Sequence, residues 1–174
     1  MRVDIDQISR EYAAQIVKWK SDPILAEQIM SDYRIVSLSE VENWIDKNTN
    51  DPNQRLRGIF LNSESGRRIV GVVRLMFIDF ESENAEFGIY IGESEFQGLG
   101  IGKEALRLIT ELAFKELKLH KIYLKVNTTN ERAIKLYKNF GFLEEGILKE
   151  HYFNNSLNKY EDVMKLGLFN SVSK

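Results

Sequence analysis

The residues best suited to chemistry form a glycine-rich heptapeptide, Gln97-Gly98-Leu99-Gly100-Ile101-Gly102-Lys103. Glycine lets the backbone approach a phosphate group closely, and the free N–H groups at the start of a helix bind its negative charge. Three glycines at every second position exceed what a tight turn needs, although a turn is the structural alternative. The segment lacks the Lys-Ser/Thr pair of a Walker A loop and the third glycine of the dinucleotide-binding motif. It therefore predicts a pyrophosphate-binding loop of another kind.

The composition limits the rest of the chemistry. The 174 residues include no cysteine and 2 histidines, which excludes thiol nucleophiles and disulfides and indicates that no metal site is present. The formal net charge of −2 lacks the positive field that general nucleic-acid binding needs. No apolar run approaches the roughly 20 residues of a membrane helix, and residues 1–6 do not resemble a signal peptide. We therefore expect a cytoplasmic protein that neither spans a membrane nor binds nucleic acid.

Hydrophobic periodicity predicts the elements that would position the glycine loop. Helices are expected over 9–20, after Pro23, from Ser37 or Ser39 onward, and over 100–117. Strands are expected over 57–61, 69–78, 84–92 and 122–126, and the nearly continuous apolar strand 69–78 should be covered on both faces. A further helix should be capped at Thr128 and stop at Gly141, before an antiparallel pair over 142–153 and 159–169. This order predicts one α/β domain over residues 1–174, with a mixed sheet flanked by helices.

The glycine loop is followed by a long helix, a strand, Asn130 and the segment Tyr137-Lys138-Asn139-Phe140-Gly141-Phe142. This succession resembles the GNAT superfamily of acetyl-CoA-dependent N-acetyltransferases, over nearly the whole chain and most strongly over 85–146. The resemblance implies an α/β (α+β) fold with a mostly antiparallel central sheet, acetyl-CoA as the acetyl donor, and pairing of the strand 87–91 with the pantetheine arm. The residues that it implies as contacts of acetyl-CoA are Phe87, Ile89, Tyr90, Ile91, Gln97, Gly98, Leu99, Gly100, Ile101, Gly102, Lys103 and Asn130.

Two side chains are candidates for the proton transfers of this reaction. An amine that attacks a thioester must lose a proton, and the departing thiolate must gain one. Tyr137 matches the family's usual proton donor to the thiolate; alternatively, it is a core aromatic on the apolar stripe of its helix. Glu86 is the candidate catalytic base, acting directly or through a water; alternatively, it is one exposed acid among several. A backbone N–H near Ile89 to Ile91 would stabilise the oxyanion.

Charge is unevenly distributed along the chain and bears on the acceptor. Residues 97–138 hold nine basic and four acidic side chains, whereas residues 79–95 hold six acids and no base. This pattern predicts an anion-binding half beside an acidic strip that favours a cationic amine, with two solvated faces as the alternative. The acceptor pocket should also use residues 25–36 and 146–160, where four bases could meet a phosphate group: Arg34, Lys149, His151 and Lys159.

The acceptor is expected to be a small-molecule amine. The stretch from Trp19 to Glu40 resembles ribosomal-protein and aminosugar-nucleotide acetyltransferases, whereas residues 120–124 and 160–163 resemble spermidine acetyltransferases. An aminosugar nucleotide suits both the acidic strip and the four bases, which ranks it slightly ahead of a polyamine and above a protein N-terminus. A non-catalytic acyl-CoA-binding module is the competing class of protein. A homodimer is the assembly to test.

Overall fold

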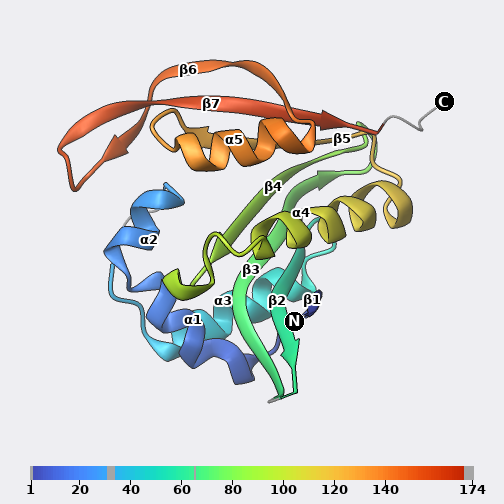
Figure 1. The fold of residues 1–174 in the computed structure, drawn as a ribbon, viewed down its shortest axis with the longest axis vertical. Helices are drawn as coiled ribbons and strands as arrows, with labels where there is room; N and C mark the ends of the chain where they lie inside the picture. Colours follow the sequence, from blue (N-terminus) through green and yellow to red (C-terminus); the bar gives the residue numbers. More distant parts are fainter. Residues whose placement is uncertain (1, 31–33, 65, 171–174) are drawn as a thin grey trace.

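The computed structural model describes residues 2–30, 34–64 and 66–170. Its strands are β1 (Arg2–Gln7), β2 (Arg55–Ser63), β3 (Gly66–Asp79), β4 (Asn84–Ile91), β5 (Lys121–Asn127), β6 (Leu143–Asn154) and β7 (Lys159–Phe169). In these described residues the strands form one seven-stranded sheet in the order β1-β2-β3-β4-β5-β7-β6 (Figure 1). Neighbouring strands are antiparallel except β4 and β5, which are parallel. The mixed, mostly antiparallel sheet confirms the expected fold class.

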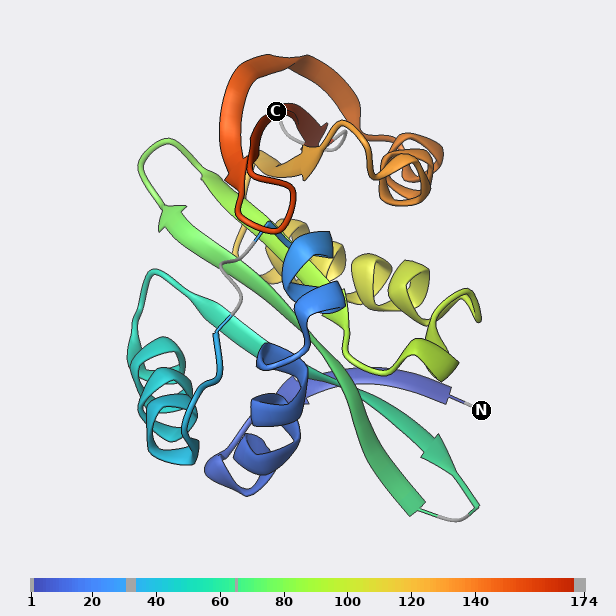
Figure 2. The same cartoon turned by 90° about the vertical axis from the view of Figure 1, so that its left-hand side faces the viewer.

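Helices cover both faces of the sheet, as Figures 1 and 2 show. One side holds α1 (Ala13–Lys20), α2 (Pro23–Gln28) and α3 (Leu38–Asn50), and the other holds α4 (Ile101–Glu111). The last helix, α5 (Glu131–Phe140), lies beside β5, β6 and β7. Two 3-10 turns, Arg10–Tyr12 and Ser94–Phe96, precede α1 and α4, and a π-helical turn, Leu112–Glu116, extends α4. The helix expected over 9–20 therefore starts as a 3-10 turn, and the helix expected over 100–117 ends as a π-helical one.

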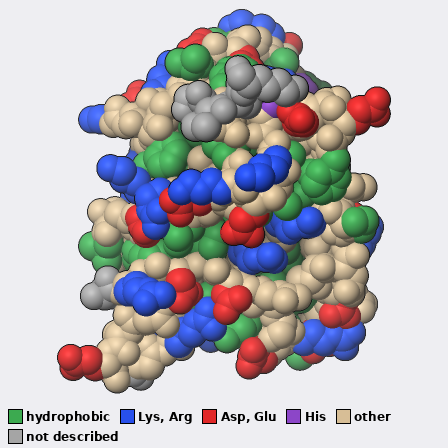
Figure 3. Space-filling view, turned by 90° about the vertical axis from the view of Figure 1, so that its right-hand side faces the viewer, with side chains coloured by type: hydrophobic (Ala, Val, Ile, Leu, Met, Phe, Trp, Pro, Cys, Tyr) green, Lys and Arg blue, Asp and Glu red, His purple; other side chains and the backbone are tan. Residues whose placement is uncertain are grey.

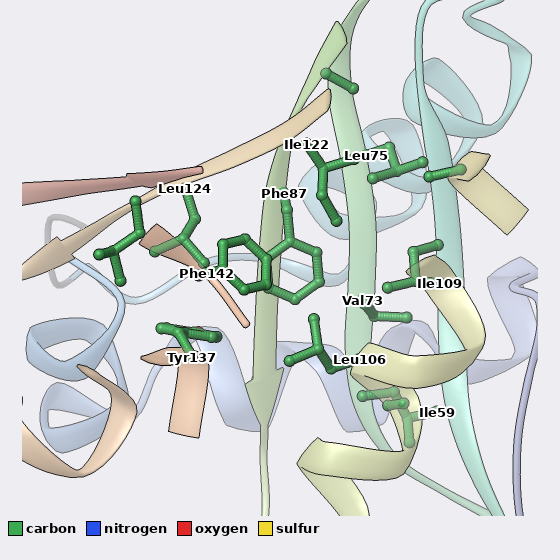
Figure 4. Packing of buried hydrophobic residues seen from close by; sticks show 14 of the residues in the cluster. Ile59, Val73, Leu75, Phe87, Leu106, Ile109, Ile122, Leu124, Tyr137 and Phe142 are labelled. Atoms are coloured by element: carbon green, nitrogen blue, oxygen red, sulfur yellow. The ribbon is translucent and has the colours of Figure 1, made fainter. Parts of the chain in front are cut away.

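Two hydrophobic clusters, one on each face of the sheet, hold these layers together. Strand β3 contributes to both, because Val73 and Leu75 pack with α4 whereas Ile69 and Val72 pack with α1 and α3. All four side chains are at most 5% exposed. Figure 4 shows members of the cluster on the α4 side, including Val73 beside Leu106 of α4. Burial on both faces confirms the prediction for the strand over 69–78.

Helix starts follow the side chains that can satisfy free backbone N–H groups. Helix α3 has the capping box at Ser37, whose Oγ accepts from Glu40 N at 3.3 Å, so the first of the two overlapping candidates is the one used. The prediction that Thr128 caps α5 is wrong: Asn130 caps it, and its Oδ1 accepts from Ala133 N at 3.1 Å. The Thr128 hydroxyl instead donates to the Asp162 carbonyl at 3.1 Å. Gly141 ends the helix in the left-handed conformation (φ 116°), as expected.

Strand β1 is an element that the sequence reading did not include. Val3 and Ile5 pack against the cluster on the α4 side, and Asp4 and Asp6 form ion pairs with Arg67 of β3 at 3.2 and 2.9 Å. The strand pairs antiparallel with β2 and closes that edge of the sheet.

Within the described ranges, no helix is both long and apolar enough to cross a membrane.

Candidate active site

The site lies where two neighbouring strands separate. Strands β4 and β5 pair only over Asn84–Glu86 and Lys121–Tyr123, and beyond these residues they diverge. A cavity of about 1180 Å³ occupies the gap, lined on one side by residues 87–91 and on the other by 124–126. Along the edge of β4 that faces β5, the backbone beyond Glu86 pairs with no described strand. An extended ligand can therefore add to the open edge through main-chain hydrogen bonds.

The glycine loop forms one end of this cavity, with Gln97, Gly98, Gly100, Gly102 and Lys103 in its wall. Gly98 and Gly100 have φ values of 84° and 82°, a conformation that other residues rarely adopt. Gly100 is the N-cap of α4 and provides no side-chain cap, so the first N–H groups of the helix are left for a ligand. A Cβ added at Gly100 or Gly102 would meet no atom within 4 Å. This open space beside free N–H groups fits a phosphate group.

Two residues of the loop have side chains outside the cavity. The Leu99 side chain is 61% exposed, and Ile101 is buried in the cluster on the α4 side. Neither lines the cavity. The contribution expected of both residues through their backbone N–H groups stays a prediction.

Arg132, in the first turn of α5, also faces the loop, although the sequence reading did not place it in the site. Its Nη1 lies 3.4 Å from Gln97 Oε1, and its Nη2 lies 3.5 Å from the ideal Cβ position of Gly98. Arg132 and Lys103 thus bring two positive charges to the end of the cavity where the backbone N–H groups are free. The arrangement favours an anion with several oxygen atoms.

Tyr137 projects from α5 into an aromatic group beside the cavity. Its ring centroid lies 6.1 Å from that of Phe87 on β4 and 5.7 Å from that of Phe142. Figure 4 shows these three side chains close together. The residue is 8% exposed, and its hydroxyl forms no hydrogen bond with a described residue. Burial raises the pKa of Tyr137, which keeps the phenol protonated at neutral pH. A packed ring and an available proton occur together, so the core and catalytic interpretations are compatible.

Glu86 is placed at the point where β4 and β5 separate. Its side chain is 16% exposed, lines the cavity and forms an ion pair with Lys125 of β5, whose Nζ lies 3.3 Å from Oε2. The other carboxylate oxygen, Oε1, has no described partner. The ion pair holds the carboxylate across the gap between the strands and leaves one oxygen for a proton from an amine.

Asn130 and Tyr90 both line the cavity. Asn130 caps α5 and also places its Nδ2 3.5 Å from the Gln28 carbonyl of α2, so it joins the two helices at the cavity rim. Tyr90 shares a face of β4 with Glu86 and packs edge-on against Trp19 of α1, with ring centroids 6.0 Å apart. Its hydroxyl is buried without a hydrogen-bond partner among the described residues.

The charges expected to attract the acceptor are largely neutralised. Three of the four proposed phosphate-binding bases form ion pairs, Arg34 with Glu40, Lys149 with Asp162 and Lys159 with Glu161. His151 is the one of the four in the cavity wall, and residues 31–33 of the expected acceptor segment lie outside the described residues. Of the six acids in the strip, only Glu86 lines the cavity. Figure 3 shows acidic and basic side chains intermixed on the face it presents, which matches the alternative of solvated surfaces.

Two cations that the sequence reading did not place in the site line the other half of the cavity. They are Lys20, at the end of α1, and Arg74, on β3. Burial and the neighbouring Arg74 and Arg34 lower the pKa of Lys20, and burial lowers the pKa of Arg74. Neither forms an ion pair with a described residue.

Among the described residues, no three His, Asp or Glu side chains are arranged to hold a metal ion.

An open strand edge beside a glycine loop with free N–H groups is the arrangement expected of a class of proteins that bind an extended phosphate-bearing ligand. A family model described as an acetyltransferase (GNAT) domain matches residues 2–143. The chain therefore belongs to the GNAT acetyltransferase family, and the resemblance inferred from the glycine loop is confirmed.

Relatives with described activities cover most of the chain. The spermidine N(1)-acetyltransferase of Vibrio cholerae serotype O1 is 34% identical over 135 residues, which cover 78% of this chain and 75% of that protein. The corresponding enzyme of Escherichia coli strain K12 is 32% identical over 130 residues, which cover 75% of this chain and 66% of that protein. The crystal structure of the Vibrio cholerae enzyme in complex with CoA and spermine has a TM-score of 0.88, at 28% identity, over 97% of this chain and 96% of that chain.

Proposed function

We propose that this chain transfers the acetyl group of acetyl-CoA to a primary amine of a small molecule, by direct attack of the amine on the thioester. The observation that carries the proposal is one cavity whose wall contains the glycine loop, the open edge of β4, Glu86 and Tyr137. The acetyltransferase family of the chain, and relatives that act on spermidine, support it. We also infer that residues 1–174 form one catalytic domain.

The residues present fit acetyl-CoA as the donor substrate. The N–H groups of residues 98–103 would hold the pyrophosphate, with Lys103 and Arg132 supplying positive charge. The pantetheine arm would lie along residues 87–91, where the amide groups of β4 have no described strand partner. Asn130 at the rim would contact the donor with the part of its amide that does not cap α5. A solved relative holds CoA, which supports this placement.

The chemistry needs two proton transfers and stabilisation of one oxyanion. The amine nitrogen forms a bond to the carbonyl carbon, and Glu86 accepts its proton directly or through a water. A backbone N–H near Ile89 to Ile91 stabilises the oxyanion of the tetrahedral intermediate. The carbon–sulfur bond then breaks, and the Tyr137 hydroxyl protonates the departing thiolate. No covalent bond to the enzyme forms in this scheme, which suits a chain without cysteine.

The test is release of free CoA from acetyl-CoA in the presence of separate amines. The panel should contain spermidine, aminosugar nucleotides, amino acids and short peptides, with mass spectrometry of the acetylated product. Acetylation of any small-molecule amine by wild-type enzyme, and its loss in Glu86→Gln, supports the proposal. Acetyl-CoA binding with no release from any amine would indicate a non-catalytic module, and activity on peptides alone would indicate a protein acceptor. Light scattering of the same samples tests the expected homodimer.

A further inference from the structure

We propose that the acceptor half of the cavity contains an anion-binding subsite formed by Lys20, Arg74 and the Tyr90 hydroxyl. This subsite would select primary amines that also carry a carboxylate or a phosphate group. The inference rests on the proposed function, because it names the chemical class of the acceptor at the same site.

Arg74 is directed across the sheet toward the cavity. It lies opposite Gly88 in the antiparallel register of β3 and β4, between Val72 opposite Tyr90 and Met76 opposite Glu86. Its Nε lies 3.5 Å from the ideal Cβ position of Gly88, so the guanidinium arm crosses the strand where a side chain is lacking. No hydrogen bond or ion pair joins it to a described residue. Glu86, two positions along β4 from Gly88, favours the charged form of Arg74 without forming an ion pair with it. A largely buried guanidinium without a direct partner is costly unless a ligand supplies an anion.

Lys20 reaches the same region from the opposite layer. The preceding residue, Trp19, is 3% exposed and packs directly on Gly92, which fixes the end of α1 over β4. Lys20 then extends into the cavity wall with its Nζ 4.4 Å from the ring centroid of Trp44. Lys20 and Arg74 repel each other, and the pKa of Lys20 is lowered by burial and by this neighbour. An anion bound beside both side chains would offset their mutual repulsion and the cost of burying the Lys20 ammonium group.

Tyr90 supplies a hydrogen-bond donor near Arg74. Its hydroxyl is buried and has no hydrogen-bond partner among the described residues, and other atoms of the residue line the cavity. Burial raises the pKa of this phenol while Arg74 opposes the shift, so the group is protonated at neutral pH. A buried hydroxyl normally has a partner, and a carboxylate or phosphate oxygen would be a suitable one.

The remaining charge of the acceptor half does not favour a polycation. Glu86 is the acidic side chain in the described cavity wall, and it is already paired with Lys125 at 3.3 Å. Arg34, the other base near Lys20, is paired with Glu40. A second ammonium group of a polyamine would therefore meet Lys20 and Arg74 and be repelled. This differs from the acceptor named for the spermidine-acetylating relatives.

The geometry also limits the size of the acceptor. The Cα atoms of Glu86 and Gly88 are separated by two strand positions, about 7 Å. Arg74 crosses β4 at Gly88, so the amine and the anionic group must lie within one compact molecule.

Matched acceptors test the charge preference directly. Aminopentanoate, aminopentanol and diaminopentane have the same primary amine on similar chains that end in an anion, a neutral group and a cation. Phosphoethanolamine and ethanolamine form the phosphate arm of the comparison, and spermidine is included. Wild-type enzyme should have a KM at least about tenfold lower for an anionic acceptor than for its neutral partner. Equal or better use of diaminopentane or spermidine would overturn the inference while leaving the proposed function intact.

Variants then assign the preference to the subsite. Arg74→Gln should raise the KM of the preferred anionic acceptor by about 10- to 100-fold, the range of one charge-assisted hydrogen bond, and change kcat little. It should leave the KM for the neutral acceptor unchanged, and Arg74→Lys should restore much of the affinity. Because Arg74 has no described partner, Arg74→Gln should not lower Tm. Arg57→Gln, at a partly buried arginine of β2 outside the cavity wall, is the matched control and should leave kcat and the KM of every acceptor unchanged.

Binding separates failure of the inference from failure of the proposed function. Aminopentanoate and phosphoethanolamine are titrated calorimetrically into wild type, Arg74→Gln and Lys20→Gln in the presence of CoA. If no amine is acetylated but either anionic amine binds wild type and not the variants, the subsite is supported and the proposed function is wrong. If neither binds wild type, or the variants bind both equally well, the subsite is overturned.

Discussion

Replacement of Tyr137 by phenylalanine separates its packing role in the core from its proposed role as proton donor. The two roles predict different losses of free energy, one in stability and one in catalysis. The ring is packed against Phe87 and Phe142 and is retained in Tyr137→Phe. The hydroxyl has no described hydrogen-bond partner, so its removal should change the free energy of unfolding by no more than about 0.5 kcal/mol. Loss of a general acid should lower kcat by about 10²- to 10⁴-fold, equivalent to roughly 3–5 kcal/mol of transition-state stabilisation. The effect on catalysis should exceed the effect on stability by several kcal/mol.

The measurement compares kcat at saturating acetyl-CoA and acceptor with urea unfolding and calorimetric titration of acetyl-CoA. Tyr12→Phe is the matched control, because Tyr12 is also packed edge-on against a phenylalanine, Phe60, at 5.3 Å, but lies outside the cavity wall. This control should retain wild-type kcat, and Tyr137→Phe should retain wild-type affinity for acetyl-CoA.

Two results would refute the reasoning about Tyr137. A Tyr137→Phe enzyme with wild-type kcat would show that the residue is only part of the core. A loss of stability as large as the loss of catalytic free energy would show that the hydroxyl supports the fold, and the kinetic effect could then not be assigned to proton transfer.

Three other changes test the rest of the site and one helix start. Gly102→Val should weaken acetyl-CoA binding by at least about tenfold in a calorimetric titration. It should lose little stability, since the added Cβ meets no protein atom within 4 Å. Glu104→Val, in the same turn of α4, is the control and should bind acetyl-CoA with wild-type affinity. Glu86→Gln should lower kcat/KM by about 10² or more, and a variant that retains the wild-type kcat/KM would place the base elsewhere. Hydrogen bonds from the Ser37 backbone N–H, Arg34 and the Ser37 hydroxyl lower the pKa of Glu40 from 4.5 to about 2. Since the folded-state pKa is depressed, this stabilisation is complete above pH 4.5 and lost toward pH 2, so the difference in unfolding free energy between wild type and Glu40→Gln should shrink over that range; a constant difference would contradict it.

Local signals were sufficient for elements whose pattern is long or whose end is marked by a specific residue. The strand over 69–78 has apolar residues at successive positions, which is the pattern expected when both faces are covered, and β3 is buried in that way. Gly141 marked the end of α5 because the left-handed conformation there favours glycine. Strand β1 was missed because Val3 and Ile5 are only two apolar positions, and pairing with β2 supplies what the short pattern lacks.

The start of α5 shows why spacing alone can select the wrong cap. Thr128 and Glu131 have the spacing of a capping box, but the Thr128 hydroxyl is occupied by the Asp162 carbonyl of β7. Asn130 is free of that contact and caps the helix instead. The competing hydrogen bond comes from a strand that follows the helix in the chain, so no local window contains it.

The sequence indicates the proposed donor half of the site but not the acceptor half, for one physical reason. In the proposed site the glycine loop would act through its own backbone, so its residue types alone indicate a phosphate-binding role. The acceptor half depends on which charges remain unpaired after folding. Many basic residues of the region over 97–138 form ion pairs with nearby acids, for example Arg107 with Glu104 and Lys138 with Glu144. Lys20 and Arg74 come from different layers and line the same cavity, and neither forms an ion pair with a described acid, so acceptor choice can change at these two positions while the donor loop stays the same.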